Sequence, residues 1–169
     1  MNKNIRRQLT LFVDRKDADS IENIRKAFNS LQYGLIDSHV TLCREDDIEN
    51  IDVVLNNLQK LNTTKITIHF GPPIRFNNDS GVLLPALGDN EQFQQLRLKV
   101  LADLGLALRQ HEPHITLMHP RNSVCTDEIF KKIQETKLPS FLTFDNISFI
   151  KQVDGGQWEI LEVFKLSDV

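Results

Sequence analysis

Two copies of one four-residue phrase carry the groups in this sequence that are best suited to chemistry. His39-Val40-Thr41-Leu42 and His114-Ile115-Thr116-Leu117 lie 75 positions apart, and each consists of a histidine, a β-branched apolar residue, a threonine and a leucine. On a β-strand alternate side chains share a face, so each histidine would lie about 6.6 Å from its threonine, opposite the apolar pair. Two such strands would present two imidazoles and two hydroxyls.

A pair of imidazoles suits acid–base chemistry on a phosphodiester. The unperturbed pKa of histidine is about 6.5, so both protonation states are available near neutral pH. One ring can take a proton from water while the other gives one to the leaving oxygen, each role contributing about 10²–10⁴ in rate. The hydroxyls of Thr41 and Thr116 can donate to the non-bridging phosphate oxygens. These four side chains supply acid, base and donors, so we expect neither a metal nor a cofactor.

The surroundings of the two copies strengthen the motif, because a single strand histidine is more often structural. The same offset of 75 superposes further pairs: Leu9 on Leu84, Asp14 on Asp89 and Ile66 on Phe141. A strand–helix–strand–helix–strand order therefore occurs twice, as an internal repeat. We predict a single domain over residues 1–169, with lobe 1 at about 5–76 and lobe 2 at about 81–166.

The hydrophobic pattern predicts a chain of short strands and helices. Strands are expected at 6–13, 38–44, 65–70 (continued past a turn at 74–76), 82–87, from Pro113 through the second motif, 141–152 and 158–166. Helices are expected from Asp17 or Asp19 to Gly34, from Asp46 or Asp47 to Leu58, from Asp89 or Asn90 to Gly105, and from Thr126 to Ile133. The predicted fold class is α+β: two pseudo-symmetric lobes, each a small antiparallel sheet with helices outside, whose His-x-Thr strands face a central cleft.

Composition limits the classes of protein. A net charge of −3 and a pI near 5.9 argue against a protein that coats nucleic acid by charge alone, but allow binding of a nucleotide or an RNA end. No apolar stretch approaches the roughly 20 residues of a membrane helix, and Leu9 to Val13 is too short for a signal peptide. Cys43 and Cys125 form no disulfide framework or metal spacing. We therefore expect a cytoplasmic monomer that does not bind membranes.

Four further residues are candidates for substrate binding. Arg44 and Arg121 follow the motifs closely, and either could hold a phosphate or be a solvated surface arginine. His119 could bind substrate at the rim or lie plainly on the surface. Phe76 could stack a base or pack against the protein.

Other groups near the motifs are expected to be structural or exposed. Cys43 and Met118 each lie two positions beyond a motif threonine, where they could floor the pocket. His111 is expected at the surface. Phe149 and Trp158 belong to a hairpin around Asp154-Gly155-Gly156 and are expected in the core.

The paired motif resembles the two-histidine (2H) phosphoesterase superfamily over roughly Arg6 to Leu166. Gly81 to Leu87, a helix and Pro113 to Leu117 most resemble the branch called 2′-5′ RNA ligase or RNA 2′,3′-cyclic phosphodiesterase. That branch often continues as His-x-Thr-Leu-x-Arg, whereas this chain has His119 at the arginine position and an arginine two residues later.

The resemblance implies metal-independent hydrolysis of a nucleoside or RNA 2′,3′-cyclic phosphate, or of a 2′-5′ linkage, to a 2′-phosphomonoester. It implies that His114 activates water and His39 protonates the leaving oxygen; from the residues alone the reverse assignment stays open. One alternative is hydrolysis of a small nucleotide, such as an ADP-ribose cyclic phosphate or a cyclic oligonucleotide signal. The other is a non-catalytic module that binds a nucleotide or an RNA end, which the four intact motif residues disfavour.

Overall fold

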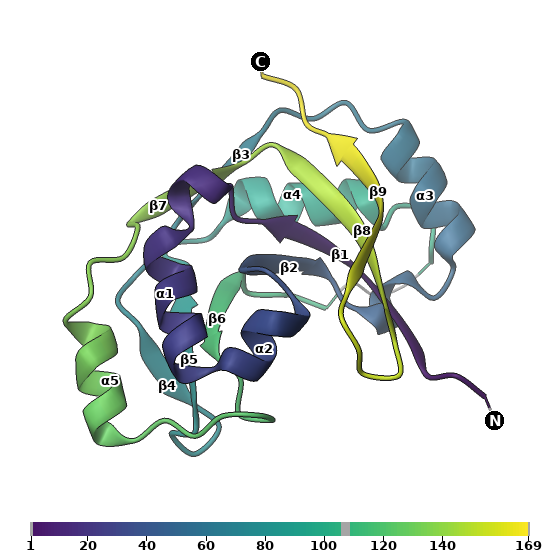
Figure 1. Cartoon of the computed structure of the whole chain (residues 1–169). Helices are drawn as coiled ribbons and strands as arrows, with labels where there is room; N and C mark the ends of the chain where they lie inside the picture. The colour runs from purple at the N-terminus through teal and green to yellow at the C-terminus, as the bar shows by residue number, and fades with distance from the viewer. Residues whose placement is uncertain (1, 106–108, 169) are drawn as a thin grey trace.

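Two antiparallel sheets form the frame of the computed structural model, which describes residues 2–105 and 109–168 (Figure 1). One sheet has the strand order β4-β5-β6-β2-β1-β8-β9 and the other pairs β3 with β7. The strands are β1 (Ile5–Phe12), β2 (His39–Cys43), β3 (Ile66–His69), β4 (Ile74–Phe76), β5 (Gly81–Pro85), β6 (His114–Met118), β7 (Phe141–Phe144), β8 (Asn146–Val153) and β9 (Glu159–Lys165). The helices are α1 (Asp19–Phe28), α2 (Ser30–Leu35), α3 (Ile51–Gln59), α4 (Glu91–Val100) and α5 (Asp127–Gln134), with 3₁₀ turns at Arg15–Asp17 and Glu45–Ile48.

The lobes interlock instead of carrying separate sheets. The predicted α+β class with antiparallel sheets is confirmed, but β2 pairs with β6 at Val40 and Ile115, so both motif strands lie in the middle of one sheet. The third strands of the two repeats, β3 and β7, also pair with each other. Pairing in this way satisfies main-chain groups that two small sheets would leave at open edges.

Each lobe's first helix packs against the other lobe's motif strand. Helix α1 contacts β6, and α4 contacts β2 and β3. In Figure 1, α4 lies behind the sheet while α1 and α2 lie in front of β5 and β6. The two motifs are therefore held by elements from both repeats.

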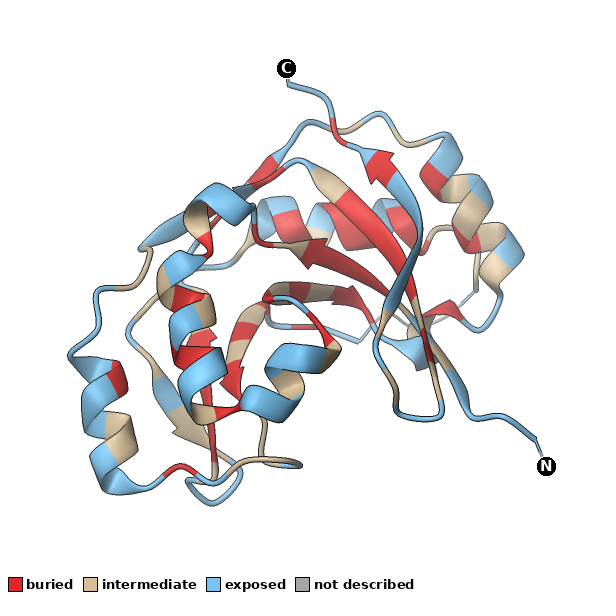
Figure 2. Ribbon diagram, in the orientation of Figure 1, coloured by how far each residue is buried: buried red, intermediate tan, exposed pale blue. Residues whose placement is uncertain are grey.

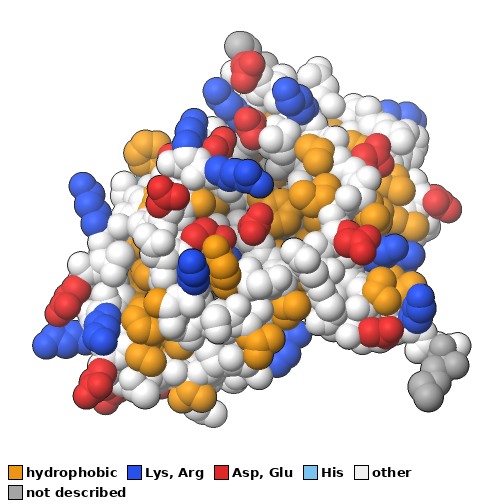
Figure 3. Space-filling model, viewed as in Figure 1, with side chains coloured by type: hydrophobic (Ala, Val, Ile, Leu, Met, Phe, Trp, Pro, Cys, Tyr) orange, Lys and Arg blue, Asp and Glu red, His pale blue; other side chains and the backbone are white. Residues whose placement is uncertain are grey.

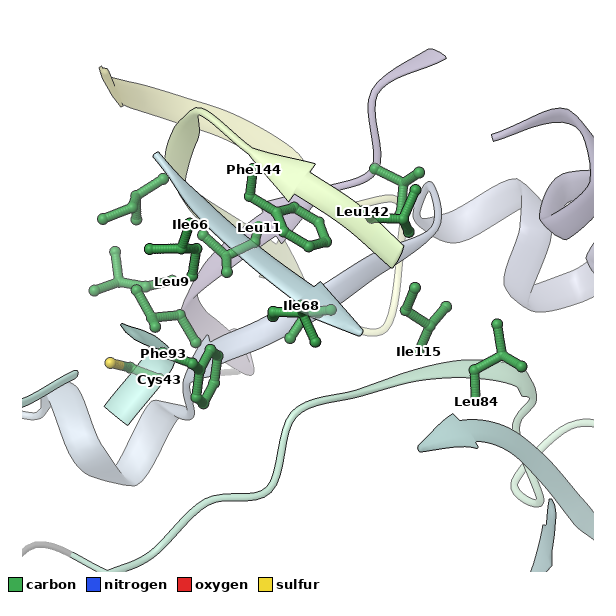
Figure 4. Packing of buried hydrophobic residues seen from close by; sticks show 14 of the residues in the cluster. Leu9, Leu11, Cys43, Ile66, Ile68, Leu84, Phe93, Ile115, Leu142 and Phe144 are labelled. Atoms are coloured by element: carbon green, nitrogen blue, oxygen red, sulfur yellow. The ribbon is translucent and has the colours of Figure 1, made fainter. Parts of the chain in front are cut away.

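The apolar faces of the motif strands form the centre of the core. Val40, Leu42, Ile115 and Leu117 have no exposed surface, in agreement with the predicted alternation. Figure 2 shows this burial along the central strands, and Figure 4 shows Ile115 and Leu84 near Ile68 and Leu142 of the second sheet. Because one face of each strand is fixed by packing, the opposite face carries the histidine and threonine in a defined direction.

The helix predicted to run to Gly34 is two helices. It breaks at Asn29, whose φ of −145° and ψ of 55° are not helical. The Asn29 side chain is buried and donates from Nδ2 to Oδ1 of Asn122 at 2.8 Å. A buried side chain that bonds to a distant loop outweighs local helical periodicity here.

Two predicted strands also differ. The segment 141–152 is two strands in different sheets, β7 and β8, and Ile74–Phe76 pairs with β5 instead of extending β3. The pairing places Leu11, not Leu9, at the position equivalent to Leu84, because Phe12 lies opposite His39 as Pro85 lies opposite His114. Thus the offset is 75 in the motif strands and 73 in their neighbours.

The hairpin between β8 and β9 closes as predicted. Asp154 and Gly155 turn it with φ values of 51° and 73°, which glycine and aspartate tolerate. The hairpin is anchored to α2, because the Trp158 amide donates to the carbonyl of Leu35 at 2.9 Å. Charged side chains of both signs are interspersed on the face seen in Figure 3. None of the helices in the described residues has the length and apolar character to cross a membrane.

Candidate active site

A cleft of about 650 Å³ brings the two motifs together. Its lining includes His39 and Thr41 from β2 and His114 and Thr116 from β6. All four side chains are partly exposed, whereas their strand neighbours are buried. The structure therefore places the four predicted catalytic residues at a single cleft.

The two histidines are oriented by the same hydrogen bond. Nδ1 of His39 lies 2.7 Å from the carbonyl oxygen of Asp37, and Nδ1 of His114 lies 3.0 Å from that of Glu112. A carbonyl oxygen only accepts, so each Nδ1 carries the proton and donates it to the residue two positions earlier. This tautomer leaves each Nε2 to exchange protons in the cleft.

The two threonines have different partners. Thr10 of β1 lies opposite Thr41, and Gln8 donates from Nε2 to Oγ1 of both, at 2.7 Å to Thr10 and 3.5 Å to Thr41. In lobe 2, Leu83 of β5 lies opposite Thr116. Because the Thr41 oxygen accepts from Gln8, its own O–H is left to donate to a substrate oxygen.

His39 lies in a more desolvating environment than a surface histidine. Burial lowers its pKa to about 4, the positive charges of Arg25 and His114 add to this, and the hydrogen bond to Asp37 opposes it. The edge of its ring also meets Phe12, with the ring centroids 6.0 Å apart. Without a bound substrate, the His39 ring is therefore neutral at neutral pH.

Arginines surround the histidines on several sides. Arg25 is buried, and its guanidinium bonds to Glu22 and to the carbonyl of Ile36, both at 2.5 Å. Arg44 and Arg121, both candidates for substrate binding, are exposed residues that line the cleft. The rim also carries Glu45, Asp46 and Glu49. Positive charge thus lies within the cleft, beside an acidic edge.

The predicted rim residue His119 lines the cleft beside Arg121. Its Nδ1 accepts from the Arg121 amide at 3.1 Å, and Nη2 of the same arginine lies 3.1 Å from its Nε2. Burial and then the charges of Arg121 and Arg6 lower the pKa of His119. Since its main-chain amide donates to Oδ1 of Asn29 at 2.7 Å, this rim from lobe 2 is fixed on lobe 1.

Phe76 is not among the residues that line the described cleft. It lies on β4, which is separated from the motif strand β6 by β5. Its ring covers Gly81, where a Cβ atom would come within 2.6 Å of ring carbon Cε1. The packing alternative is therefore the correct one for Phe76, and Gly81 is required by this close approach.

Cys43 and Met118 do not floor the cleft, for the same reason in both lobes. The pairing skips one residue of each motif strand, Leu42 between Thr41 and Cys43 and Leu117 between Thr116 and Met118. These irregularities turn the following side chain into the core, where both residues are fully buried. Burial raises the pKa of Cys43 to about 12, so its thiol is not a nucleophile at neutral pH.

Several lining residues were not predicted. Trp158, expected in the core, is half-buried in the cleft wall, with the Cζ atom of Arg6 5.4 Å from its ring centroid. Arg6 is also held by Glu45 at 3.2 Å and Gln152 at 3.4 Å. The alternation of Arg6, Gln8 and Thr10 along β1 was a signal for polar side chains on the cleft face. His111, expected at the surface, is largely buried and lines the cleft.

Comparisons with known proteins identify one family. The family model of the 2′-5′ RNA ligase superfamily matches residues 12–156. A protein of Bacillus pumilus (strain SAFR-032) named "Putative phosphoesterase" is 22% identical over 166 residues, which cover 95% of this chain and 96% of that protein.

Two solved structures have a similar fold. E. coli LigT complexed with 3′-AMP has a TM-score of 0.66 at 14% identity, covering 96% of this chain and 98% of that chain. E. coli LigT complexed with phosphate has a TM-score of 0.65 at 15% identity, covering 98% of this chain and 99% of that chain. At these identities the likeness shows the fold.

Proposed function

Because the chain belongs to the 2′-5′ RNA ligase superfamily of 2H phosphoesterases, we propose that it hydrolyses a nucleoside or RNA 2′,3′-cyclic phosphate, or a 2′-5′ linkage, to a 2′-phosphomonoester. The observation that carries this proposal is the matched pair of imidazoles. Both Nδ1 atoms are occupied by main-chain carbonyls, so two Nε2 atoms are left for proton transfer in one cleft.

The proposed reaction on a cyclic phosphate is a single displacement at phosphorus. Nε2 of His114 takes a proton from water as its oxygen bonds to phosphorus. The P–O3′ bond breaks, and O3′ takes the proton carried by Nε2 of His39. The hydroxyls of Thr41 and Thr116 donate to the non-bridging oxygens, whose charge they stabilise. The reaction ends with His114 protonated and His39 neutral, and the product keeps its phosphate on O2′.

This assignment requires His39 to gain a proton when substrate binds. Burial keeps the ring neutral at neutral pH, since its pKa is about 4. A phosphodiester anion beside the His39 ring favours its charged form and raises the pKa of His39. Binding of the anion would thus protonate the acid, whereas with His39 as base no such uptake by His39 is needed.

Nucleotide recognition is proposed for the cleft wall and rim. Arg44, Arg121 and His119 offer donors for substrate phosphates. The guanidinium of Arg6 lies over Trp158, and an arginine plane or an indole can stack a base. E. coli LigT, which shares the fold, binds 3′-AMP in its crystal structure, which supports a nucleotide substrate here.

A second candidate is hydrolysis of a small cyclic nucleotide, such as an ADP-ribose cyclic phosphate or a cyclic oligonucleotide signal. The net charge of −3 favours it, because a protein of net negative charge attracts the extended backbone of a long RNA only weakly. We also propose that the chain acts as a monomer in the cytoplasm. One chain supplies all four motif residues, which supports the monomer, and size-exclusion chromatography with light scattering tests it.

The function is tested with a substrate panel in EDTA. Adenosine 2′,3′-cyclic phosphate, an RNA ending in a 2′,3′-cyclic phosphate, a 2′-5′ dinucleotide and ADP-ribose 1″,2″-cyclic phosphate are incubated with the protein and followed by ³¹P NMR. Turnover of the first two to 2′-phosphates supports the proposal, and preference for the last supports the small-nucleotide alternative. Tight binding without turnover of any substrate would reject an enzyme and leave the binding module.

A further inference from the structure

The main-chain link between the two motif strands is short. In the described part of the chain, the register of β2 with β6 consists of the pair Val40 and Ile115. Thr41 follows this pair directly and has no partner on β6 in that register. The relative position of the two threonines therefore needs support from side chains.

Two buried side chains of lobe 2 supply that support by bonding to successive carbonyls of β2. His111 Nε2 lies 3.1 Å from the carbonyl oxygen of Thr41, and Nη1 of Arg97 on α4 donates to that of Leu42. Their exposed fractions are 5% and 2%, so neither bond is open to competition from bulk water. Arg97 is in turn paired with Asp47 at 3.5 Å.

His111 also meets the second motif. Its ring stacks on Phe93, with centroids 6.1 Å apart, and its centroid lies 6.1 Å from that of His114. The side chain of Gln94 donates to the His111 carbonyl at 2.7 Å, which fixes the residue to α4. One imidazole therefore bonds to the main chain of one motif and contacts the histidine of the other.

The protonation state of His111 suits a fixed donor. Because the Thr41 carbonyl only accepts, Nε2 must carry the proton. Burial and then the charges of Arg97, Arg44 and His114 lower the pKa of His111 to about 4, so the ring is neutral at neutral pH. A neutral ring holds the strand without adding positive charge beside His114.

We propose that His111 is a positioning residue of the paired motif: it donates from Nε2 to the Thr41 carbonyl and packs against His114, and so sets the distance between the two halves of the site. The kinetic part of this proposal rests on the proposed phosphodiesterase activity. His111 touches neither reacting atom in this role, and acts through Thr41 and His114.

The kinetic test compares two variants on adenosine 2′,3′-cyclic phosphate. His111→Leu keeps an apolar contact with Phe93 but has no donor, and His111→Gln retains a donor at a similar reach. We expect kcat of His111→Leu to fall about 10-fold with KM changed less than about 3-fold, since one buried hydrogen bond that holds a catalytic group is lost. His111→Gln should recover kcat to within about 3-fold of wild type. His69→Leu, which removes an exposed histidine that contacts Phe141 outside the cleft, should leave kcat unchanged.

Either of two kinetic results would overturn the proposal: full kcat in His111→Leu, or a His111→Gln variant as slow as His111→Leu when both melt as wild type does. A second experiment, which needs no enzymatic turnover, distinguishes failure of the His111 proposal from failure of the proposed function. In ¹H–¹⁵N spectra of the histidine rings, His111 should be the Nε2–H tautomer with a slowly exchanging proton. The Nδ1–H tautomer, or a proton that exchanges as fast as that of His69, would reject His111 as the donor whether or not the protein has activity.

Discussion

The two lobes present the same motif from different surroundings. Each motif histidine donates from Nδ1 to a carbonyl two residues earlier, and each motif strand has a pairing irregularity after its threonine. The neighbouring strands differ. Beside the first motif, β1 carries Phe12, Thr10 and Gln8; at the equivalent positions beside the second motif, β5 carries Pro85, Leu83 and Gly81. The two lobes thus share the geometry of the motif, whereas in the described residues lobe 1 places polar side chains beside its threonine and lobe 2 places apolar ones.

This difference separates two tasks. The shared elements fix the imidazoles and hydroxyls, which is what proton transfer needs from both sides of a phosphate. The side chains beside the first motif, Gln8 and Arg6 of β1 and Trp158 of the β8–β9 hairpin, line the cleft where the rest of a substrate would lie. The comparison predicts that changes in shared features remove activity and that changes on the cleft wall beside the first motif alter selectivity.

The largest expected effect is loss of either histidine. His39→Ala and His114→Ala should each lower kcat by at least about 10³-fold, because each removes one of two proton transfers. The double variant should be little worse than either single variant, since the rings act as a unit. Initial rates on a 2′,3′-cyclic phosphate measure this, with thermal melting as the control. Single variants whose effects multiply in the double variant would show that the lobes do not act together.

Loss of a threonine hydroxyl should rank next. Thr41→Val and Thr116→Val should each lower kcat by about 10²-fold, because a donor to the developing charge is removed while shape is kept. Comparing kcat of the two variants tests the lobe symmetry directly. Equal losses are expected; a variant that keeps full kcat would place the phosphate away from that lobe.

Substitution of Trp158 should act on selectivity. Trp158→Ala should raise KM for adenosine 2′,3′-cyclic phosphate by about 5- to 50-fold, in line with the loss of one stacked base, and leave ribose 2′,3′-cyclic phosphate unaffected. Trp158→Phe should retain most of the affinity. If KM rises equally for both substrates, the indole has a structural role in the hairpin instead.

Gln8→Leu should have a smaller effect, because it removes the amide that donates to Thr41, a partner that lobe 2 lacks at the equivalent residue, Gly81. We expect kcat to fall about 5-fold, as the Thr41 hydroxyl loses the partner that orients it. Gln95→Leu on the exposed face of α4 is the matched control. An unchanged kcat in Gln8→Leu would mean that Thr41 needs no orienting partner.

The smallest expected effect is on how the stability of the folded chain depends on pH. The pKa values of His39 and His111 are about 4 in the folded chain and about 6.5 when unfolded, so below pH 6.5 the unfolded chain binds more protons. Their neutral burial therefore favours folding fully above pH 6.5, and this contribution is lost as pH falls toward 4. Melting temperatures at pH 7 and pH 4.5 should differ less in His39→Gln than in wild type. An equal difference would contradict the lowered pKa of His39.

The sequence predicted much of this arrangement because the signals were local and repeated. Alternation placed Val40 and Leu42 in the core and His39 and Thr41 on the other face, and the repeat indicated two such strands. It failed at Cys43 and Met118, because a pairing irregularity in a strand leaves no mark in the hydrophobic pattern. It also failed at Trp158 and His111, whose positions depend on a hairpin docking on α2 and on a loop inserted between lobes.

The central claim is that paired histidines direct water to the phosphorus of a 2′,3′-cyclic phosphate. It is tested most directly by ³¹P NMR of adenosine 2′,3′-cyclic phosphate with the protein in ¹⁸O-labelled water and EDTA. The account predicts adenosine 2′-phosphate with one ¹⁸O on phosphorus from the wild-type protein, and no product from His39→Ala or His114→Ala. The account would be contradicted by an unlabelled product, by a 3′-phosphate product, or by turnover at the wild-type rate in either variant.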